Sequence, residues 1–399
     1  MDSIRVEEIS RSDIKILEMA AASITDVRHL SSYNWIDASV PTIAVPGTPP
    51  LWTPPKPPQK VPKDSGHIYI AQNAARYPEC PLEPLFRALY ISNPSFDICS
   101  IDLVTDRNNI RKLLAFVNPY LTEHRLEPFT INVEVANNTA IFCRAETETQ
   151  RFIGPHEFVG FGHEFEKTYT TSQVDGSTGH HRVISYRFSG LKFLLRYETD
   201  GYIDIPPKAQ AQNKDAESDT LSSMIESLSL HSANSLPHAA STKSKLRVNE
   251  EGQGVPIEST LEIKTRVFHK PIAIQEVLPQ LWVSQTPNLV RAYHRNGLFQ
   301  PPKVENVTLE IRRWENEHQE DLKMLAALIR RIINAAKRCG GNAIVKYGYQ
   351  GDKLMVRKTE SRKLLPDDLY SKLNPKSSLI TKHKKNLDPA VGSEFRKTT

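Results

Sequence analysis

Cysteine is scarce in this chain, with four residues in a sequence of 399. None of them falls in a Cys-x-x-Cys spacing, which argues against a zinc site or a disulfide framework and favours a reducing compartment. No apolar run approaches ~20 residues, so the sequence predicts no membrane span. The N-terminus is charged and has no apolar core, so we expect no secretory signal.

A strong excess of one charge is also missing. The net charge of +5 and the pI near 8.8 are compatible with nucleic-acid binding but do not by themselves indicate it. Gly160 and Gly162 lack the third glycine of a dinucleotide-binding loop. The Asp367–Asp368 pair lacks the third aspartate of a prenyl-diphosphate synthase motif, which argues against that class of enzyme.

Composition divides the chain into an ordered part and several additions. Hydrophobic residues make up 39% of the sequence, and many of the 28 prolines lie in one stretch near the N-terminus. A later segment is rich in Ser, Ala, Asn and Lys and has few large apolar side chains. We therefore expect a proline-rich extension over 1–63, which starts with a helix or loose segment over 1–30, and one ordered domain over 64–207 and 256–363. A disordered insertion over 208–255 and a basic flexible tail over 364–399 make up the rest.

Strand-like and helix-like patterns alternate through the ordered part. This order predicts an α/β fold of the mixed α+β type, in which helices flank a mixed central β-sheet. A long amphipathic pattern predicts a helix over 320–339, and Asn137–Asn138 predicts a hairpin turn. The strands that matter most for function are predicted over 180–190, 191–201, 260–268 and 307–316.

Two short charged motifs stand at the ends of buried strands. Glu198 and Asp200 follow "LKFLLRY", and Glu262 and Lys264 lie within "TLEIKTRVF". Residues two apart on a strand share a face, so neighbouring strands would bring three carboxylates and one ammonium together. Such a concentration of negative charge is costly unless a cation such as Mg²⁺ or Mn²⁺ neutralises it. The combination suits a metal-activated water that attacks a phosphodiester.

Each motif alone means little, because charged residues two apart are common on solvated strands. Both motifs in order on apolar strands, with "HEFEKTY" before them and "LPQLW" after them, favour a site over a solvated surface. The pair His180–His181 is a weaker candidate for a set of metal ligands than the acidic motifs. Adjacent strand residues point to opposite faces, so we expect one of these histidines to pack and the other to be exposed.

The motif order resembles the DXO/Rai family of eukaryotic decapping nucleases, which has a PD-(D/E)XK-type nuclease core, and the chain looks like a divergent, fungal-like member. The resemblance runs from about Asp64 to Lys358 without the insertion. It rests on "TDRNNIRKLL", "GHEFEKTY", "YETDG", "LEIKTR" and "LPQLWVSQTPNLVRAYHRNG". Thr199 departs from the hydrophobic residue that the family has between its two acids, and the insertion could reshape the RNA entrance.

The resemblance implies a metal site. Asp200 and Glu262 would hold the metal directly, with help from the backbone carbonyl of Ile263. Glu166 and Glu198 would hold the metals directly or through water. The implied cofactor is Mg²⁺ or Mn²⁺.

The resemblance also implies residues that bind the substrate. Lys264 would position the attacking water or counter the charge on phosphorus. Arg107 and Gln280 would contact the 5′ nucleotides together with Glu198 and Lys264, and Gln285 is the alternative to Gln280. The implied catalytic set is Glu198, Asp200, Glu262 and Lys264.

Members of this family remove defective or unusual caps from RNA 5′ ends, many degrade RNA in the 5′→3′ direction, and some fungal members bind a nuclear 5′→3′ exoribonuclease. We therefore expect a metal-dependent decapping nuclease or pyrophosphohydrolase that acts on RNA 5′ ends in the nucleus, with the cytoplasm open as a second compartment. Two alternatives stay open. The chain could be a catalytically weak relative that acts as partner or scaffold of an exoribonuclease, or a nuclease that acts on DNA.

Overall fold

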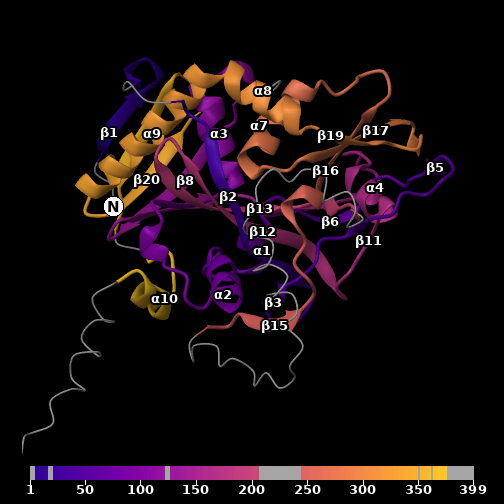
Figure 1. Ribbon diagram of the computed structural model, residues 1–399, viewed down its shortest axis with the longest axis horizontal. Coiled ribbons are helices and arrows are strands. Elements are labelled where there is room, and N and C mark those ends of the chain that lie inside the picture. Colours follow the sequence, from indigo (N-terminus) through magenta and orange to yellow (C-terminus); the bar gives the residue numbers. More distant parts are fainter. Residues whose placement is uncertain are drawn as a thin grey trace, which may run out of the picture.

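The computed structural model describes residues 5–16, 21–121, 126–205, 244–348, 351–360 and 363–374 (Figure 1). Within these residues two large mixed sheets are flanked by helices, as the sequence predicted. The larger sheet has eleven strands in the order β1 (Arg5–Ser10), β21 (Lys353–Lys358), β20 (Asn342–Tyr347), β8 (Phe129–Ala136), β9 (Thr139–Ala145), β7 (Leu103–Asp106), β13 (Leu191–Glu198), β12 (Ser177–Phe188), β2 (Ile24–Ile36), β3 (Thr42–Pro46) and β15 (Arg247–Glu251).

The second sheet carries the other half of the site. Its order is β11 (Thr170–Thr171), β4 (Leu51–Trp52), β14 (Gly201–Tyr202), β16 (Thr260–Val267), β17 (Asn288–Arg295), β18 (Leu298–Phe299) and β5 (Gln59–Lys60), and β19 (Val304–Asn306) also pairs with β17. A separate ribbon joins β6 (Gly66–Tyr69) to β10 (Gln150–Ile153). Short 3₁₀ turns span Arg11–Asp13, Ile98–Ser100, Pro119–Leu121 and Ile257–Ser259.

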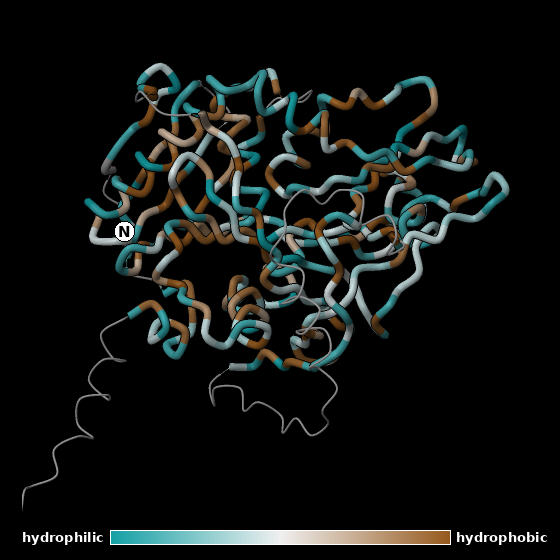
Figure 2. Tube along the Cα trace, viewed as in Figure 1, coloured by the Kyte–Doolittle hydropathy of each residue, from teal (hydrophilic) through white to brown (hydrophobic). Residues whose placement is uncertain are grey.

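The central strands of the larger sheet are covered on both faces, which explains their nearly continuous apolar sequences. On β13, Leu195 packs into one core and Leu194 into the core on the opposite face. One core includes residues of α3 (Arg107–Val117), α7 (Ile274–Ser284), α8 (Thr308–Glu317) and α9 (Gln319–Arg338). The other includes α2 (Glu83–Ser92) and α10 (Asp367–Lys372), and α1 (Gln72–Arg76) precedes α2. Figure 2 shows these hydrophobic segments gathered in the interior.

A third, smaller core lies under the second sheet. Helix α4 (Gly162–Tyr169) packs there through Phe165 and Tyr169, whose rings stack with centroids 3.9 Å apart. Trp52 stacks on Tyr169, so this part of the proline-rich stretch lies against the folded domain.

Several predicted elements are confirmed, and one is wrong. The predicted hairpin is formed by β8 and β9, with Asn137 at φ 55°, and the long helix is α9. Residues 307–316 were predicted as a strand but form α8. The buried side chains there are Val307, Ile311 and Trp314, which recur at helical rather than alternating spacing.

The expected helix or loose segment over 1–30 is also wrong. Residues Arg5–Ser10 form β1, and β2 is a strand of 13 residues that lies between β12 and β3. Tyr33 and Trp35 of β2 are completely buried. The first part of the chain therefore contributes directly to the core of the larger sheet.

The predicted insertion and tail fall largely outside the described residues. Of the predicted insertion over 208–255, residues 208–243 are not described, but β15 lies within its last part and pairs in parallel with β3, so that part is ordered. Of the tail, 375–399 are not described, whereas α10 packs Leu369 into the core and Asp368 binds Arg87 at 2.6 Å. Among the described residues, no helix is both long and apolar enough to cross a membrane.

Truncation of Leu195 should test the packing that supports the site. This side chain is completely buried in the middle of β13, so Leu195→Ala should lower the free energy of unfolding by about 2–5 kcal/mol. Urea denaturation monitored by circular dichroism measures the change. Leu298→Ala is the matched control, because Leu298 is 42% exposed and should cost well under 1 kcal/mol. Equal losses in the two variants would contradict this account of the core.

Candidate active site

The chain passes from one sheet to the other at the predicted acidic motif. Strand β13 of the larger sheet ends at Glu198, and β14 of the second sheet begins at Gly201. Strand β14 pairs with β16, and the Oδ2 atom of Asp200 accepts a hydrogen bond of 2.7 Å from the backbone N–H of Ile263. The two predicted motifs therefore meet at the seam between the sheets.

Glu262 is the centre of the polar contacts at this seam. Its side chain is buried, and its Oε1 atom accepts hydrogen bonds from the Nζ of Lys264 at 2.5 Å and from the amide of Gln280 on α7. Its Oε2 atom accepts from Arg107, the first residue of α3, at 3.0 Å. Burial alone raises the pKa of Glu262, but the two cations outweigh burial and bring the pKa down to about 2.

Three other carboxyl groups have pKa values shifted in the opposite direction. Burial and then the charge of Glu262 raise the pKa of Asp200 to about 7. Burial and then the charge of Asp200 raise the pKa of Glu166 well above its usual range. Glu198 is exposed to solvent, yet crowding by surrounding protein raises its pKa as well. The cluster thus holds more negative charge than Arg107 and Lys264 neutralise.

Helix α4 brings Glu166 into the cluster. Phe165 and Tyr169 anchor the helix in the core against Phe299, and Glu166 is the residue after Phe165. The carboxylate of Asp64 accepts a hydrogen bond of 3.0 Å from the N–H of Glu164, which fixes the first turn of α4. The aromatic spacing in "HEFEKTY" therefore sets the orientation of this acid.

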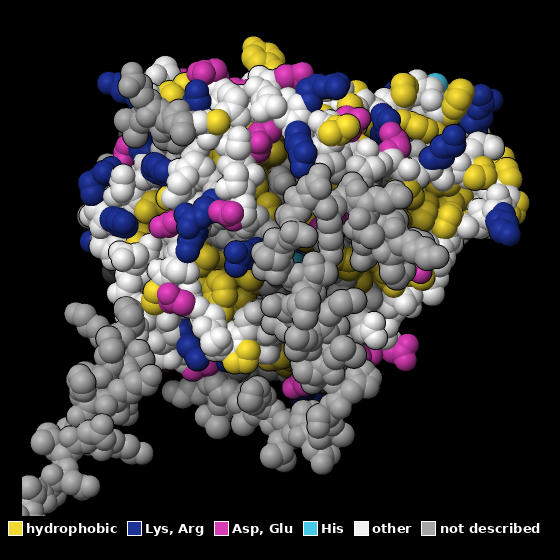
Figure 3. All heavy atoms as spheres, viewed as in Figure 1, with side chains coloured by type: hydrophobic (Ala, Val, Ile, Leu, Met, Phe, Trp, Pro, Cys, Tyr) yellow, Lys and Arg dark blue, Asp and Glu magenta, His cyan; other side chains and the backbone are white. Residues whose placement is uncertain are grey.

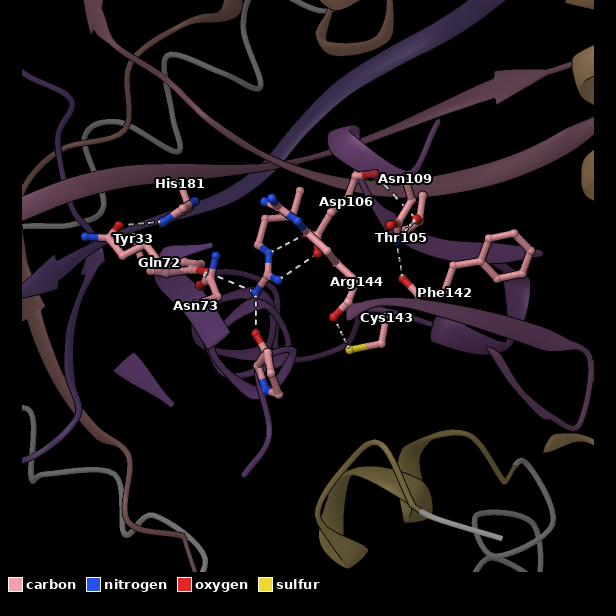
Figure 4. Close-up of polar contacts among 12 residues, drawn as sticks. Tyr33, Gln72, Asn73, Thr105, Asp106, Asn109, Phe142, Cys143, Arg144 and His181 are labelled. Carbon is pink, nitrogen blue, oxygen red and sulfur yellow. Dashed lines mark hydrogen bonds and ion pairs between the residues drawn. The ribbon is translucent and has the colours of Figure 1, made fainter. Parts of the chain in front are cut away.

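A buried ion pair fixes the position of Arg107. Strand β7 pairs in parallel with β13, so Asp106 lies opposite Arg196. The guanidinium of Arg196 donates to both carboxylate oxygens of Asp106, at 2.7 and 3.0 Å, and also to the carbonyl of Pro81 and the hydroxyl of Tyr33. Figure 4 draws this network beside the side chains of the neighbouring cavity. Because Asp106 precedes α3 directly, the network fixes the point where the helix begins.

The structure brings most of the predicted residues together. The side chains of one cluster, joined by hydrogen bonds or by mutual electrostatic effects, are Arg107, Glu166, Glu198, Asp200, Glu262, Lys264 and Gln280. Ile263 contributes its backbone N–H, and its side chain is buried in the core. Gln285 ends α7 at φ 54° and donates to the carbonyl of Trp282, so Gln280 rather than Gln285 reaches Glu262.

The expectation for the histidine pair is wrong. His180 and His181 are both buried, because each face of β12 is covered by a core. His180 contacts Asn34 at 2.7 Å and His181 contacts Gln72 at 3.0 Å. Burial and nearby arginines lower both pKa values, so both side chains are neutral packing residues.

Sequence reasoning missed two arginines beside the cluster. Arg111 lies one helical turn after Arg107 on α3, and Arg144 lies on β9. Both line a cavity of about 140 Å³ that also includes Arg107 and Glu198. The four-residue spacing in "RNNIR" was a signal for Arg111, because residues at this spacing share a helix face. Arg144 had no such signal, since it depends on the pairing of β9 with β7.

The positions of the acidic side chains can be compared with the predicted metal site. Among the described residues, no group of three or more His, Cys, Asp or Glu side chains is placed to hold a metal ion. The oxygens of Glu262 are engaged by Lys264, Gln280 and Arg107. The donor set nevertheless fits Mg²⁺ or Mn²⁺, because it consists of carboxylate oxygens. The raised pKa values of Asp200 and Glu166 mark negative charge that a cation would neutralise.

The charged side chains on the surface indicate a function less clearly than those at the seam. On the face shown in Figure 3, Lys and Arg side chains are scattered among Asp and Glu side chains. This mixture agrees with the small net charge of +5. The charged cluster at the seam, rather than the surface on this face, therefore indicates a function.

Comparison with known proteins places the chain in a family. The family described as Domain of unknown function (DUF8563) matches residues 3–373. The chain belongs to this family. Among curated proteins the sequence has no match.

Solved structures identify the fold. S. pombe Rai1 is 12% identical, with a TM-score of 0.54 over 89% of this chain and 99% of that one. Scheffersomyces stipitis Rai1 in complex with (3′-NADP)⁺ and a calcium ion is 15% identical, with a TM-score of 0.52 over 88% and 94%. Candida albicans Rai1 in complex with pU5-Mn²⁺ is 14% identical, with a TM-score of 0.50 over 90% and 98%. The motif-based resemblance is confirmed at the level of the fold.

Asp200→Asn should change stability in a pH-dependent way in metal-free buffer. The folded-state pKa of about 7 lies above the ordinary value of 3.8, so the ionised carboxyl destabilises the folded chain increasingly as pH rises from about 4 to about 7. The asparagine keeps an oxygen for the Ile263 N–H and removes that charge. The variant should gain about 1–2 kcal/mol at pH 8 and much less at pH 4.5.

Urea unfolding at the two pH values measures this gain. Asp204→Asn is the control, because Asp204 is an exposed acid four residues further along. A gain that is equal at both pH values, or a loss at pH 8, would show that Asp200 is not held against its own charge.

Proposed function

We propose that the chain is a divalent-metal-dependent hydrolase that acts on RNA 5′ ends, as a decapping nuclease or pyrophosphohydrolase that continues as a 5′→3′ exoribonuclease. One observation carries the proposal: four carboxyl groups and Lys264 gather at the seam of a fold shared with Rai1. The carboxyl groups are those of Glu166, Glu198, Asp200 and Glu262. Acids on an ordinary solvated surface would not be held close enough to shift one another's pKa values in this way.

Four acids and one backbone group would hold the metal. Asp200 and Glu262 would be direct ligands with the carbonyl of Ile263, and Glu166 and Glu198 would complete the set directly or through water. Bound Mg²⁺ or Mn²⁺ would lower the pKa of a water molecule and polarise the phosphate oxygen. Its charge would also compensate the excess of carboxylates over cations.

The cations of the site would act on the phosphate. Burial alone lowers the pKa of Lys264 and of Arg107, but the charge of Glu262 reverses this in both, so both remain charged. Lys264 would position the attacking water or counter the charge that develops on phosphorus. Arg107 has the planar fork that binds a phosphate through two hydrogen bonds, and Gln280 would orient Glu262 or contact the 5′ nucleotide.

The partners follow from the same proposal. The substrate is RNA with a modified or phosphorylated 5′ end, and the larger partner is a nuclear 5′→3′ exoribonuclease, which places the chain in the nucleus. The structure of Candida albicans Rai1 with pU5-Mn²⁺ supports this choice of substrate, because that protein has the same fold. A role on DNA has no comparable support from the similar structures considered.

The ion pairs of Glu262 favour a second candidate. Both of its oxygens already accept hydrogen bonds, from Lys264 and Gln280 at Oε1 and from Arg107 at Oε2, so a metal would have to share the carboxylate with these donors. A chain in which the donors keep the metal out would be a catalytically weak partner or scaffold of an exoribonuclease. Cleavage by the purified chain decides between the two candidates.

The purified protein should release product from a 5′-modified RNA when Mn²⁺ is present and not when it is chelated. The panel should carry 5′-triphosphate, unmethylated cap, methylated cap, NAD cap and monophosphate on one sequence, with DNA of that sequence as a further arm. Asp200→Asn should lower the rate by about 100-fold or more, because it removes a metal ligand worth several kcal/mol.

Asp204→Asn is again the matched control and should keep the wild-type rate. Undiminished cleavage by Asp200→Asn would contradict the assignment of this cluster as the active site. RNA binding without cleavage under every condition would favour the scaffold, and faster cleavage of the DNA would make the chain a DNA nuclease.

A further inference from the structure

One face of the larger sheet carries a group of polar side chains within an otherwise apolar core. Arg182 in the middle of β12 pairs in register with Ser32 of β2 and with Tyr197 of β13. Side chains at paired positions lie side by side on one face of a sheet. Tyr197 and Ile184 belong to the core that α3, α7, α8 and α9 form, so these polar side chains lie on the face that this core covers.

Two histidines extend the group along the strands. His180 lies two residues before Arg182 on β12, so the two side chains share a face. His29 of β2 pairs in register with Ile184, which puts it on the same face. Burial and then the charge of Arg182 lower the pKa of both histidines, because both lie close to the guanidinium. Together these side chains form a polar row, which consists of His29, Ser32, His180, Arg182 and Tyr197.

Six buried atoms of the polar row have no hydrogen-bond partner among the described residues. They are Nε2 of His29, Oγ of Ser32, Nε2 of His180, Nε and Nη1 of Arg182 and the hydroxyl oxygen of Tyr197. The guanidinium of Arg182 donates only through Nη2, to the carbonyl of Val255 at 2.8 Å. Buried polar atoms nearly always have a partner, so this many unpartnered atoms on one face of a sheet indicate a ligand taken from solvent.

Arg182 also places a positive charge inside the core. Its side chain is completely buried, and it forms no ion pair with any residue that the structure describes. Burial lowers the pKa of Arg182, and Tyr197 and the charge of Glu258, an exposed acid, offset only part of that shift. Arginine nevertheless stays protonated in proteins. A buried guanidinium without an acidic partner at contact distance is costly, and a bound anion would remove that cost.

The protonation of His180 limits the charge of the ligand. The side-chain nitrogen of Asn34 donates to Thr48 and to Ser177, so its Oδ1 atom accepts the 2.7 Å hydrogen bond from Nδ1 of His180. In the neutral ring Nε2 is then an acceptor and adds no positive charge. The row therefore carries one positive charge, on Arg182. This matches a monovalent anion and disfavours a metal cation.

The donors that face such an anion come from the centre of the row. Arg182 offers the N–H groups of Nε and Nη1, and Ser32 and Tyr197 offer hydroxyl groups from the strands on either side. The two histidine Nε2 atoms can accept hydrogen bonds from water molecules whose second hydrogen points to the ion. Water alone would satisfy these hydrogen bonds but would leave the charge of Arg182 unopposed.

We propose that the polar row binds a buried chloride ion on the face shared by β2, β12 and β13. The ion accepts hydrogen bonds from Arg182 and from the two hydroxyl groups, and it neutralises the guanidinium. The row contacts two parts of the candidate site: the Arg107 guanidinium carbon lies 5.6 Å from the ring centroid of Tyr197, and Val255 lies in the segment that leads into β16. The chloride therefore stabilises the backbone that carries the carboxylate cluster, whether or not that cluster is catalytic.

Thermal unfolding of the full chain in different sodium salts tests the proposal. At equal ionic strength, chloride or bromide should raise Tm by about 2–5 °C over gluconate, which is too large for a buried site between side chains. The ionic strength is held constant because salt also screens surface charges. Arg182→Met should lose this halide effect, since it removes the buried charge. Arg187→Met, at an exposed position of the same strand, is the matched control and should keep the effect.

Tyr197→Phe is the second variant, because it removes one hydroxyl and keeps the ring beside Arg107, so it decides the question if Arg182→Met does not fold. It should need about 3- to 10-fold more chloride for the same rise in Tm, the usual effect of one lost hydrogen bond. A crystal soaked in bromide should show anomalous scattering beside the Arg182 guanidinium.

Equal Tm values in chloride and gluconate would overturn the proposal and assign the polar row to water molecules. A halide effect that Arg182→Met or Tyr197→Phe retains in full would also overturn it, and so would bromide bound only at the surface of the crystallised protein.

Discussion

The hydrogen bond from the Ile263 backbone to Asp200 ties the two sheets together at the site. The chain leaves the larger sheet at Glu198 and joins the second sheet at Gly201, so only Thr199 and Asp200 bridge the seam. Gly201 suits this position, because a Cβ atom would lie 3.0 Å from the carbonyl oxygen of Pro50 and would require that backbone to shift slightly. With the crossing fixed in this way, Asp200 contacts β16, and the remaining groups of the cluster are arranged around that contact.

The same seam explains why neighbouring acids have opposite pKa shifts. Glu262 lies between Lys264 and Arg107, so it remains ionised, whereas Asp200 meets mainly burial and the charge of Glu262, and Glu166 meets mainly burial and the charge of Asp200. Environments that push the pKa values of adjacent acids apart are typical of sites where protons or cations are exchanged. Glu262 stays ionised, and a bound cation would favour the ionised forms of the other acids.

Local sequence patterns predicted those strands, helices and turns whose conformation depends on neighbouring residues. The apolar runs of β13 and β16, the spacing of α9 and the turn at Asn137 each follow from backbone geometry over a few residues. Glu198, Asp200 and Glu262 followed from the motifs on these strands, whereas Glu166, which lies on α4, was implied by the resemblance of "GHEFEKTY" to a family motif. Gln280 could be favoured over Gln285 only weakly, since the choice depends on where α7 ends and Gln285 enters a left-handed conformation.

Features that depend on distant partners could not be predicted. Strand β2 reads as a polar N-terminal segment, and it becomes a central strand because β12 and β3 pair with its two edges. The pairing of Arg196 with Asp106 depends likewise on β7 lying next to β13. The stretch 307–316 was misassigned because "VTLEI" favours a strand locally, whereas burial of Ile311 and Trp314 selects a helix.

The charged residues at the start of α3 are not the ones that would stabilise this helix best. The N-terminus of a helix carries partial positive charge and favours acids, yet Arg107 and Arg111 occupy the first two turns of α3. Glu262 pairs with Arg107 at 3.0 Å, whereas the carboxylate of Asp106 is already bound by Arg196. An anion would meet the helix terminus and both guanidinium groups at once, which would stabilise this concentration of positive charge. Local choices that oppose the fold in this way are expected where a chain has been selected for what it binds.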